Sequence, residues 1–106
     1  MGERLDAAET VALLREIVDG QRTMRLRDAR RPWVQIAVGE CAVDADGVEF
    51  VFFADSATLD HLVAARLPDG RRGRFEDWLM NDGANPLDLL DDGERHEIEQ
   101  QLHEAR

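Results

Sequence analysis

The spacing of apolar residues near the start of the chain predicts a helix over residues 7–19. Apolar side chains recur there at helical spacing: Ala7, Val11, Leu13, Leu14, Ile17 and Val18. Asp6 precedes this stripe and Glu9 stands three residues later, which is the arrangement of a capping box. Gly20 ends the helix, because glycine adopts the left-handed conformation of a C-terminal stop without a Cβ clash.

Two strands joined by a tight turn are predicted in the centre of the chain. Residues 33–43 alternate in part and are rich in β-branched side chains, which predicts a strand with Gly39 as a candidate bulge. Asp46-Gly47 follows, and this dipeptide is a strong signal for a hairpin. Residues 48–55 form the second strand, whose apolar run from Phe50 to Phe53 indicates burial on both faces.

The apolar positions of residues 59–67 fit a strand and a helix equally well. We favour a third strand, because Pro68 and Asp69-Gly70 then form another tight turn into the following residues.

Helical signals return in the C-terminal third of the chain. Asn85-Pro86 opens a short turn, and Asp91 caps a last helix in which Glu94 occupies the capping-box position. Ile98 and Leu102 give this helix a narrow apolar stripe, while its other faces are polar.

These elements predict a single α+β domain over residues 1–106. It consists of an N-terminal helix, a three- to four-stranded antiparallel meander and one or two C-terminal helices packed on one face. The predicted segments are the helix 7–19, an arginine-rich connection 21–32, the meander 33–75 and the helical part 76–105.

Composition places this chain among globular proteins of the cytoplasm. A chain of 106 residues is long enough to bury one core without a disulfide or a metal. Cys41 is the only cysteine, which excludes an intramolecular disulfide and favours a reducing compartment. No apolar run approaches the length that spans a bilayer, so we expect no membrane association, and no motif calls for a cofactor.

Arginines gather in two short segments of a chain whose formal net charge is -10. The first segment, residues 22–31, contains Arg22, Arg25, Arg27, Arg30 and Arg31. The second, residues 66–74, contains four more arginines, and residues 75–106 are rich in carboxylates. Two explanations stay open: the arginines neutralise these carboxylates within the fold, or they form an anion site, for which the candidates are Arg25, Arg27, Arg30, Arg71 and Arg72.

A series of residues typical of turns and of a core extends along nearly the whole chain: Gly20, Met24, Pro32-Trp33, Asp46-Gly47, Phe53, Asp55, Leu59-Asp60, Pro68-Asp69-Gly70-Arg71, Phe75, Asp77-Trp78, Pro86 and Leu89-Leu90. In this order they resemble a family of short bacterial proteins classed as a domain of unknown function. Several members carry cysteines around Leu59-Asp60, where this sequence has Ala54, Ala57, His61 and Ala64. The resemblance implies a fold and carries over no catalytic residue.

The sequence contains only weak candidate residues for nucleophilic catalysis and for metal binding. Cys41 and His61 are the components of an enzyme hypothesis that ranks last, because residues 60 and 61 of a strand point to opposite faces. His96 and His103 are seven residues apart, whereas helical zinc pairs are usually four apart. We therefore predict no catalytic residue and no metal site.

Trp33 and Trp78 each follow an arginine segment, an arrangement that can stack bases of a single strand. A net charge of -10 opposes the approach of a polyanion, so we predict that both tryptophans anchor the core and that nucleic acid is not a direct partner.

The leading functional hypothesis is a non-enzymatic interaction protein of the inhibitor, immunity or anti-defence type. Its acidic C-terminal segment would bind a basic protein through Asp88, Asp91, Asp92, Glu94, Glu97 and Glu99. The alternative is a regulatory module that binds a small ligand or anion through the arginine segments. A homodimer formed by pairing of the second strand, at Val51, Phe52 and Phe53, is a further expectation.

Overall fold

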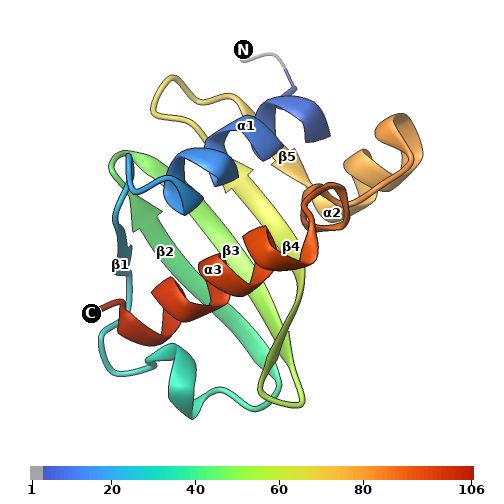
Figure 1. The fold of residues 1–106 in the computed structure, drawn as a ribbon. Coiled ribbons are helices and arrows are strands. Elements are labelled where there is room, and N and C mark those ends of the chain that lie inside the picture. The colour runs from blue at the N-terminus through green and yellow to red at the C-terminus, as the bar shows by residue number, and fades with distance from the viewer. Residues whose placement is uncertain (1–3) are drawn as a thin grey trace.

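The computed structural model describes residues 4–106 and shows two helices packed across one face of an antiparallel sheet (Figure 1). The helices are α1, Ala7–Val18, and α3, Asp92–Glu104. The five strands lie in the sheet in chain order: β1, Met24–Leu26; β2, Gly39–Ala45; β3, Val48–Asp55; β4, Thr58–Arg66; and β5, Arg72–Arg74. Shorter helical turns complete the fold: η1, Trp33–Gln35; α2, Phe75–Asp77; η2, Trp78–Asp82; and η3, Pro86–Leu89.

Both long helices begin at the capping boxes that the sequence predicts. The Asp6 carboxylate accepts the Glu9 N–H at 2.7 Å, and the Asp91 carboxylate accepts the Glu94 N–H at 2.7 Å. Gly20 follows α1 with φ +81°, in the left-handed region that glycine tolerates. An N-terminal helix, an antiparallel sheet and C-terminal helices are therefore confirmed.

The sheet has five strands rather than the predicted three to four. β1 lies inside the connection that was expected to be irregular, and its Met24 pairs with Ala45 of β2. This strand is missed because three residues are too short to show an alternating pattern. The predicted strand over 33–43 is wrong at its start: Trp33 packs into the core within a 3₁₀ turn, and β2 begins only at Gly39.

The hairpin and the third strand are confirmed, but the bulges lie elsewhere than expected. Asp46 and Gly47 have φ angles of +52° and +98°, as a tight β2–β3 turn requires. β4 occupies most of the stretch 59–67, and its register against β3 skips Asp60 and Val63. These two residues, rather than Gly39, are the bulged positions.

The core lies between the helices and the face of the sheet that they cover. Alternate residues of the strands point into it: Cys41, Val43, Ala45, Val48, Phe50, Phe52 and Leu62. Trp33 and Trp78 are 2% and 0% exposed, which confirms their predicted role as core anchors. The indole N–H of Trp78 donates to the Leu5 carbonyl at 3.0 Å.

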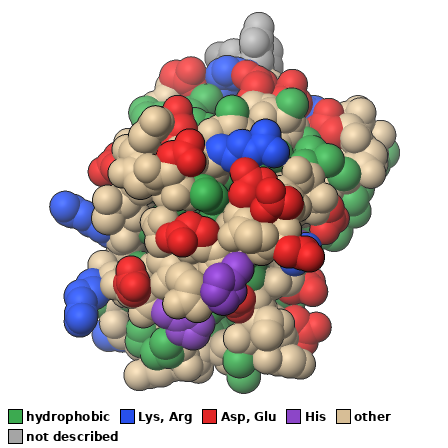
Figure 2. Space-filling model, viewed as in Figure 1, with side chains coloured by type: hydrophobic (Ala, Val, Ile, Leu, Met, Phe, Trp, Pro, Cys, Tyr) green, Lys and Arg blue, Asp and Glu red, His purple; other side chains and the backbone are tan. Residues whose placement is uncertain are grey.

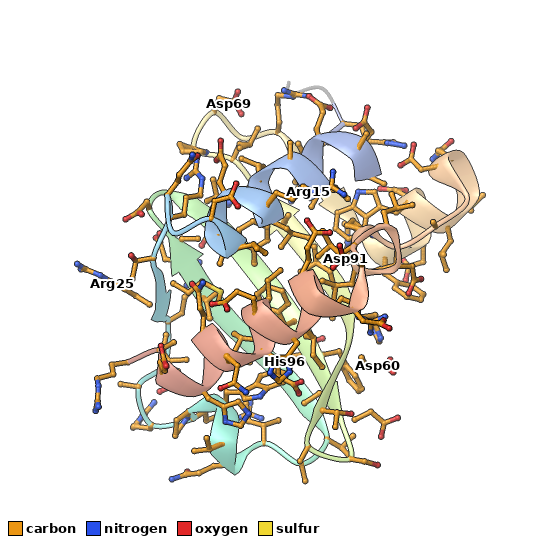
Figure 3. All side chains as sticks on the ribbon, in the orientation of Figure 1. Arg15, Arg25, Asp60, Asp69, Asp91 and His96 are labelled. Atoms are coloured by element: carbon orange, nitrogen blue, oxygen red, sulfur yellow. The ribbon has the colours of Figure 1, made fainter. Side chains whose placement is uncertain are left out.

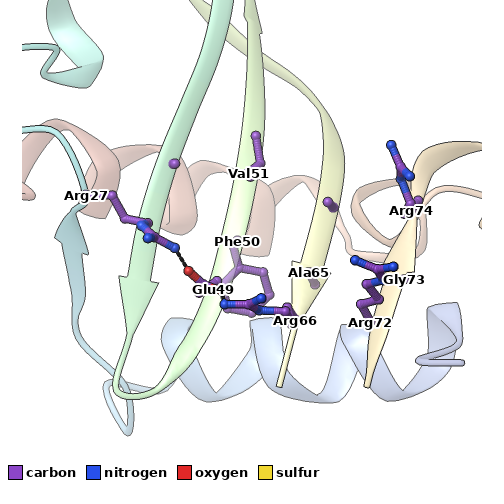
Figure 4. A pocket seen from close by; sticks show the side chains of 11 residues that line it. Arg27, Glu49, Phe50, Val51, Ala65, Arg66, Arg72, Gly73 and Arg74 are labelled. Atoms are coloured by element: carbon purple, nitrogen blue, oxygen red, sulfur yellow. Dashed lines mark ion pairs between the residues drawn. The ribbon is translucent and has the colours of Figure 1, made fainter. Parts of the chain in front are cut away.

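The other face of the sheet carries no helix (Figures 1 and 4). Val51 and Phe53 of β3 lie on this side and are half-buried, so the expectation that β3 is buried on both faces is wrong. We call this side the open face. Its residues come from all five strands.

Candidate functional site

The register of the sheet arranges the open face into three rows of side chains. Residues directly opposite each other in antiparallel strands project to the same side, so the register identifies which side chains are neighbours. The first row runs across the sheet from β1 to β5 and is entirely charged: Arg25, Asp44, Glu49, Arg66 and Arg72.

The second row has small apolar side chains in its centre. Ala42, Val51 and Ala64 are consecutive partners on β2, β3 and β4. Arg74 of β5 is the next partner of Ala64, and the Arg27 N–H donates to the Ala42 carbonyl at the opposite end. Because the central side chains are short, the face is hollowed here, and the groove has a volume of about 570 Å³ (Figure 4).

The third row is mainly aromatic, and it also contains the exposed Glu40 of β2, which is opposite Phe53. Phe53 and His61 are cross-strand partners whose rings stack with centroids 4.9 Å apart. Phe75, directly after β5, contacts His61 with ring centroids 4.7 Å apart. The Nδ1 atom of His61 lies 2.6 Å from a carboxylate oxygen of Asp60, which fixes the orientation of the imidazole.

The arginines of the open face differ in whether the fold already neutralises them. Arg27 and Arg66 both form ion pairs with Glu49, whose side chain is only 19% exposed (Figure 4). Arg72 and Arg74 are exposed and form no ion pair with any residue of 4–106. Two adjacent guanidinium groups at the wall of the groove are therefore available to an anion.

The structure brings together only part of the predicted anion site. Arg25, Arg27 and Arg72 reach the open face, and Figure 3 shows Arg25 projecting outward at the β1 edge. Arg30 instead pairs locally with Asp28, and the Arg71 side chain reaches Glu9 of α1.

Arg66 and Arg74 also lie on the open face, although neither is among the residues of the predicted anion site. The missed signal is the alternation of Arg72 and Arg74 around Gly73, which places both on one side of a strand.

Self-neutralisation of the arginine segments occurs, but with other partners than expected. Arg22 pairs with Glu16, Arg27 with Glu49 and Arg71 with Glu9. These carboxylates lie between residues 9 and 49, whereas the expectation named those of 75–106. Arg25, Arg72 and Arg74 project to the open face, whereas α3 covers the opposite face of the sheet, so these arginines do not pair with its carboxylates.

The acidic C-terminal residues lie on the helical side of the molecule, shown in Figure 2. Three of the six candidates also hold α3 in place. Asp91 caps it, and Glu94 completes the box and pairs with Arg15 at 2.9 Å. The hydrogen bond to the Asp91 N–H, and then Arg15, lower the pKa of Glu94. Glu99 accepts the Leu59 N–H at 3.0 Å.

The remaining candidates, Asp88, Asp92 and Glu97, are exposed. Asp88 has only a distant contact with Arg95, at 3.9 Å. These three carboxylates add negative charge to the helical side and take no part in the α3 capping box.

Cys41 and His61 lie on opposite faces of the sheet. Cys41 points into the core, where burial raises the pKa of its thiol, and His61 belongs to the aromatic row of the open face. This geometry separates the two components of the cysteine–histidine hypothesis. Within residues 4–106, no group of three or more His, Cys, Asp or Glu side chains is placed to hold a metal ion.

Comparison with known proteins identifies a family and no activity. The model of a domain of unknown function, DUF7693, matches residues 4–104, so the chain belongs to this family. No curated protein and no solved structure shows a significant match. In the part of the chain that the structure describes, no helix is both long and apolar enough to cross a membrane.

Proposed function

We propose that this member of the family is a non-enzymatic binding module whose open face receives a small anionic ligand. The observation that carries this proposal is the pair Arg72 and Arg74, exposed side by side on β5 with no ion pair within residues 4–106. Guanidinium groups bind phosphate and carboxylate groups through parallel hydrogen bonds, and two of them at one wall give such an anion several donors.

The shape and charge of the open face support this proposal. Its groove of about 570 Å³ lies within the size range of small-molecule sites. Five arginines share this face with four carboxylates, Glu40, Asp44, Glu49 and, beside His61, Asp60, so its local charge is opposite to that of the whole chain. A small anion therefore meets an attractive local field there.

The test is thermal unfolding in the presence of inorganic pyrophosphate. We expect stabilisation by about 2.7 kcal/mol when the ligand concentration reaches a hundred times its Kd. A variant carrying Arg72→Gln and Arg74→Gln should lose this stabilisation while unfolding at the same temperature as the parent without ligand. Arg30→Gln is the matched control, because Arg30 is exposed and pairs only with Asp28. Equal stabilisation of the double variant and the parent would sink the proposal.

A second function is favoured by the separation of charge between the two sides of the molecule. Carboxylates spread over the helical side in Figure 2, opposite the arginines of the open face. We propose on this basis that the helical side binds a basic protein, as inhibitors of nucleic-acid-binding proteins do by occupying a basic surface.

Its test uses the three carboxylates that do not cap α3. Asp88→Arg, Asp92→Arg and Glu97→Arg, combined, should abolish capture of a basic partner from a lysate of the host, whereas the parent should release that partner at high salt. The double variant of Arg72 and Arg74 is the control, since it alters charge on the opposite side. Retention of the same partner by the triple variant would exclude this surface.

A further inference from the structure

Two chemically different groups of side chains lie close together on the open face: the arginines Arg72 and Arg74, and the rings of the aromatic row. We call these two groups the walls of the site. Along β3, Phe53 is two residues from Val51 of the groove floor, and Glu49 of the charged row is two residues on the other side. Successive rows are therefore about 7 Å apart, given the rise of about 3.4 Å per strand residue. A single small ligand lying on Val51 can contact both walls.

The two walls favour different parts of a ligand. Arg72 and Arg74 favour an anionic group. The half-buried rings of Phe53, His61 and Phe75 favour a flat ring system. His61 adds a polar atom to these rings: with Nδ1 hydrogen-bonded to the Asp60 carboxylate, Nε2 is left for a ligand.

We propose that the ligand of the open face is a nucleoside phosphate, with the phosphate at Arg72 and Arg74 and the base against the aromatic row. This inference rests on the proposed anion-binding function and specifies its ligand. A base joined to a phosphate by a sugar combines a flat heteroaromatic ring and an anion in one small molecule, which is the combination that the two walls present.

A free mononucleotide and one residue of a single strand share this chemistry. The free mononucleotide is the favoured source, because a chain of net charge -10 repels the additional phosphates of a strand outside the groove. Arg30 and Arg71, two further arginines of the predicted anion site, are already paired with Asp28 and Glu9 and do not line the groove.

The experiment is a calorimetric titration of the full chain with four probes: inorganic pyrophosphate, ribose 5-phosphate, adenosine monophosphate and a short oligodeoxyadenylate. We expect adenosine monophosphate to bind about tenfold or more tightly than ribose 5-phosphate, since the two probes differ in the base. Phe53→Leu should remove this difference and leave the affinity for pyrophosphate within about twofold, because it replaces the ring by an apolar side chain and keeps both arginines. The melting temperature of the variant without ligand establishes that it is folded.

The outcomes separate the two proposals. Equal affinity for adenosine monophosphate and ribose 5-phosphate, with pyrophosphate still bound through Arg72 and Arg74, would overturn the nucleoside inference and leave the anion site intact. Failure of all four probes would overturn the anion site itself. Tighter binding of the oligodeoxyadenylate, at low and at physiological salt and sensitive to Phe53→Leu, would support the nucleotide chemistry and identify a single strand as its source.

Discussion

The guanidinium of Arg71 lies 2.6 Å from the Glu9 carboxylate and joins the turn between β4 and β5 to the first turn of α1. Glu9 also closes the capping box, in which its side chain accepts the Asp6 N–H. The hydrogen bond from Arg71, followed by the contacts with Asp6, lowers the pKa of Glu9 below its ordinary value of 4.5. One carboxylate therefore serves both the helix cap and the attachment of the sheet.

This lowered pKa predicts how acid affects the fold. A carboxyl whose pKa is lower in the folded state contributes stability that is fully present above its unfolded value and is lost as the pH falls through its folded value. Glu9→Gln should therefore reduce the melting temperature at neutral pH and converge with the parent in acid. Unfolding curves from neutral pH to well below pH 4.5 measure this. Glu76→Gln is the control, because Glu76 is exposed and has no ion pair within residues 4–106, and a constant difference at every pH would contradict the linkage.

The side chain of Asn85 bonds backbone groups of β4 that no neighbouring strand pairs, and we expect it to be important for stability. Its side chain accepts the Leu62 N–H at 3.1 Å and donates to the Leu62 carbonyl at 2.8 Å. Because β5 pairs only with the end of β4, these backbone groups have no strand opposite them. Asn85→Ala should destabilise the fold by about 2–4 kcal/mol, since it removes the partner of the two Leu62 groups and of the buried Leu87 N–H, which the Asn85 oxygen also accepts. Asn81→Ala, at an exposed residue bonded only to Asp77, should change the unfolding free energy in urea by less than about 0.5 kcal/mol.

Gly73 is required by close packing rather than by an unusual backbone angle. A Cβ atom there would lie 2.4 Å from the Leu5 carbonyl oxygen and 2.5 Å from Trp78 Nε1, the two atoms of a buried hydrogen bond. Gly73→Ala should therefore destabilise the fold by about 1–3 kcal/mol, the usual effect of overpacking. Gly93→Ala is the same substitution within α3, where the nearest atom is 3.4 Å away, and should stabilise by up to about 1 kcal/mol. Equal unfolding free energies for the two variants would contradict this distinction.

The elements with strong local signals were predictable from sequence. Asp6 with Glu9, Asp91 with Glu94, and Asp46-Gly47 each specify their structure through contacts between near neighbours, and all three are confirmed. β1 was not predictable, because its three residues become a strand only through pairing with β2, which is distant in sequence.

The open face could be predicted only in pieces. The apolar run Phe50–Phe53 shows that both sides of β3 are apolar, but not that the helices cover just one of them. Arg27 and Arg72 were candidates by composition, whereas their positions in the three rows depend on the register of five strands. The register also shows that the expected dimer contact through β3 is wrong: β3 pairs on both sides within the sheet and offers no edge to a second copy, which leaves the oligomeric state untested.

Glu49 should control the affinity of the proposed anion site. It neutralises both Arg27 and Arg66 and has the same sign of charge as the ligand. Glu49→Gln removes one negative charge from the charged row and releases these two guanidinium groups. We expect the affinity for pyrophosphate to rise by about three- to tenfold at low salt, and the gain to shrink at high salt.

Glu40→Gln is the matched control for this prediction. Glu40 is opposite Phe53 in the aromatic row and forms no ion pair with an arginine of residues 4–106, so the same loss of charge should have a smaller effect. Calorimetric titration of the parent and both variants measures the three affinities under identical salt. If the two variants gain equally, net charge alone governs binding, whereas a gain confined to Glu49→Gln indicates that the freed Arg27 and Arg66 contact the anion. No gain in either variant would place the anion elsewhere than on the open face.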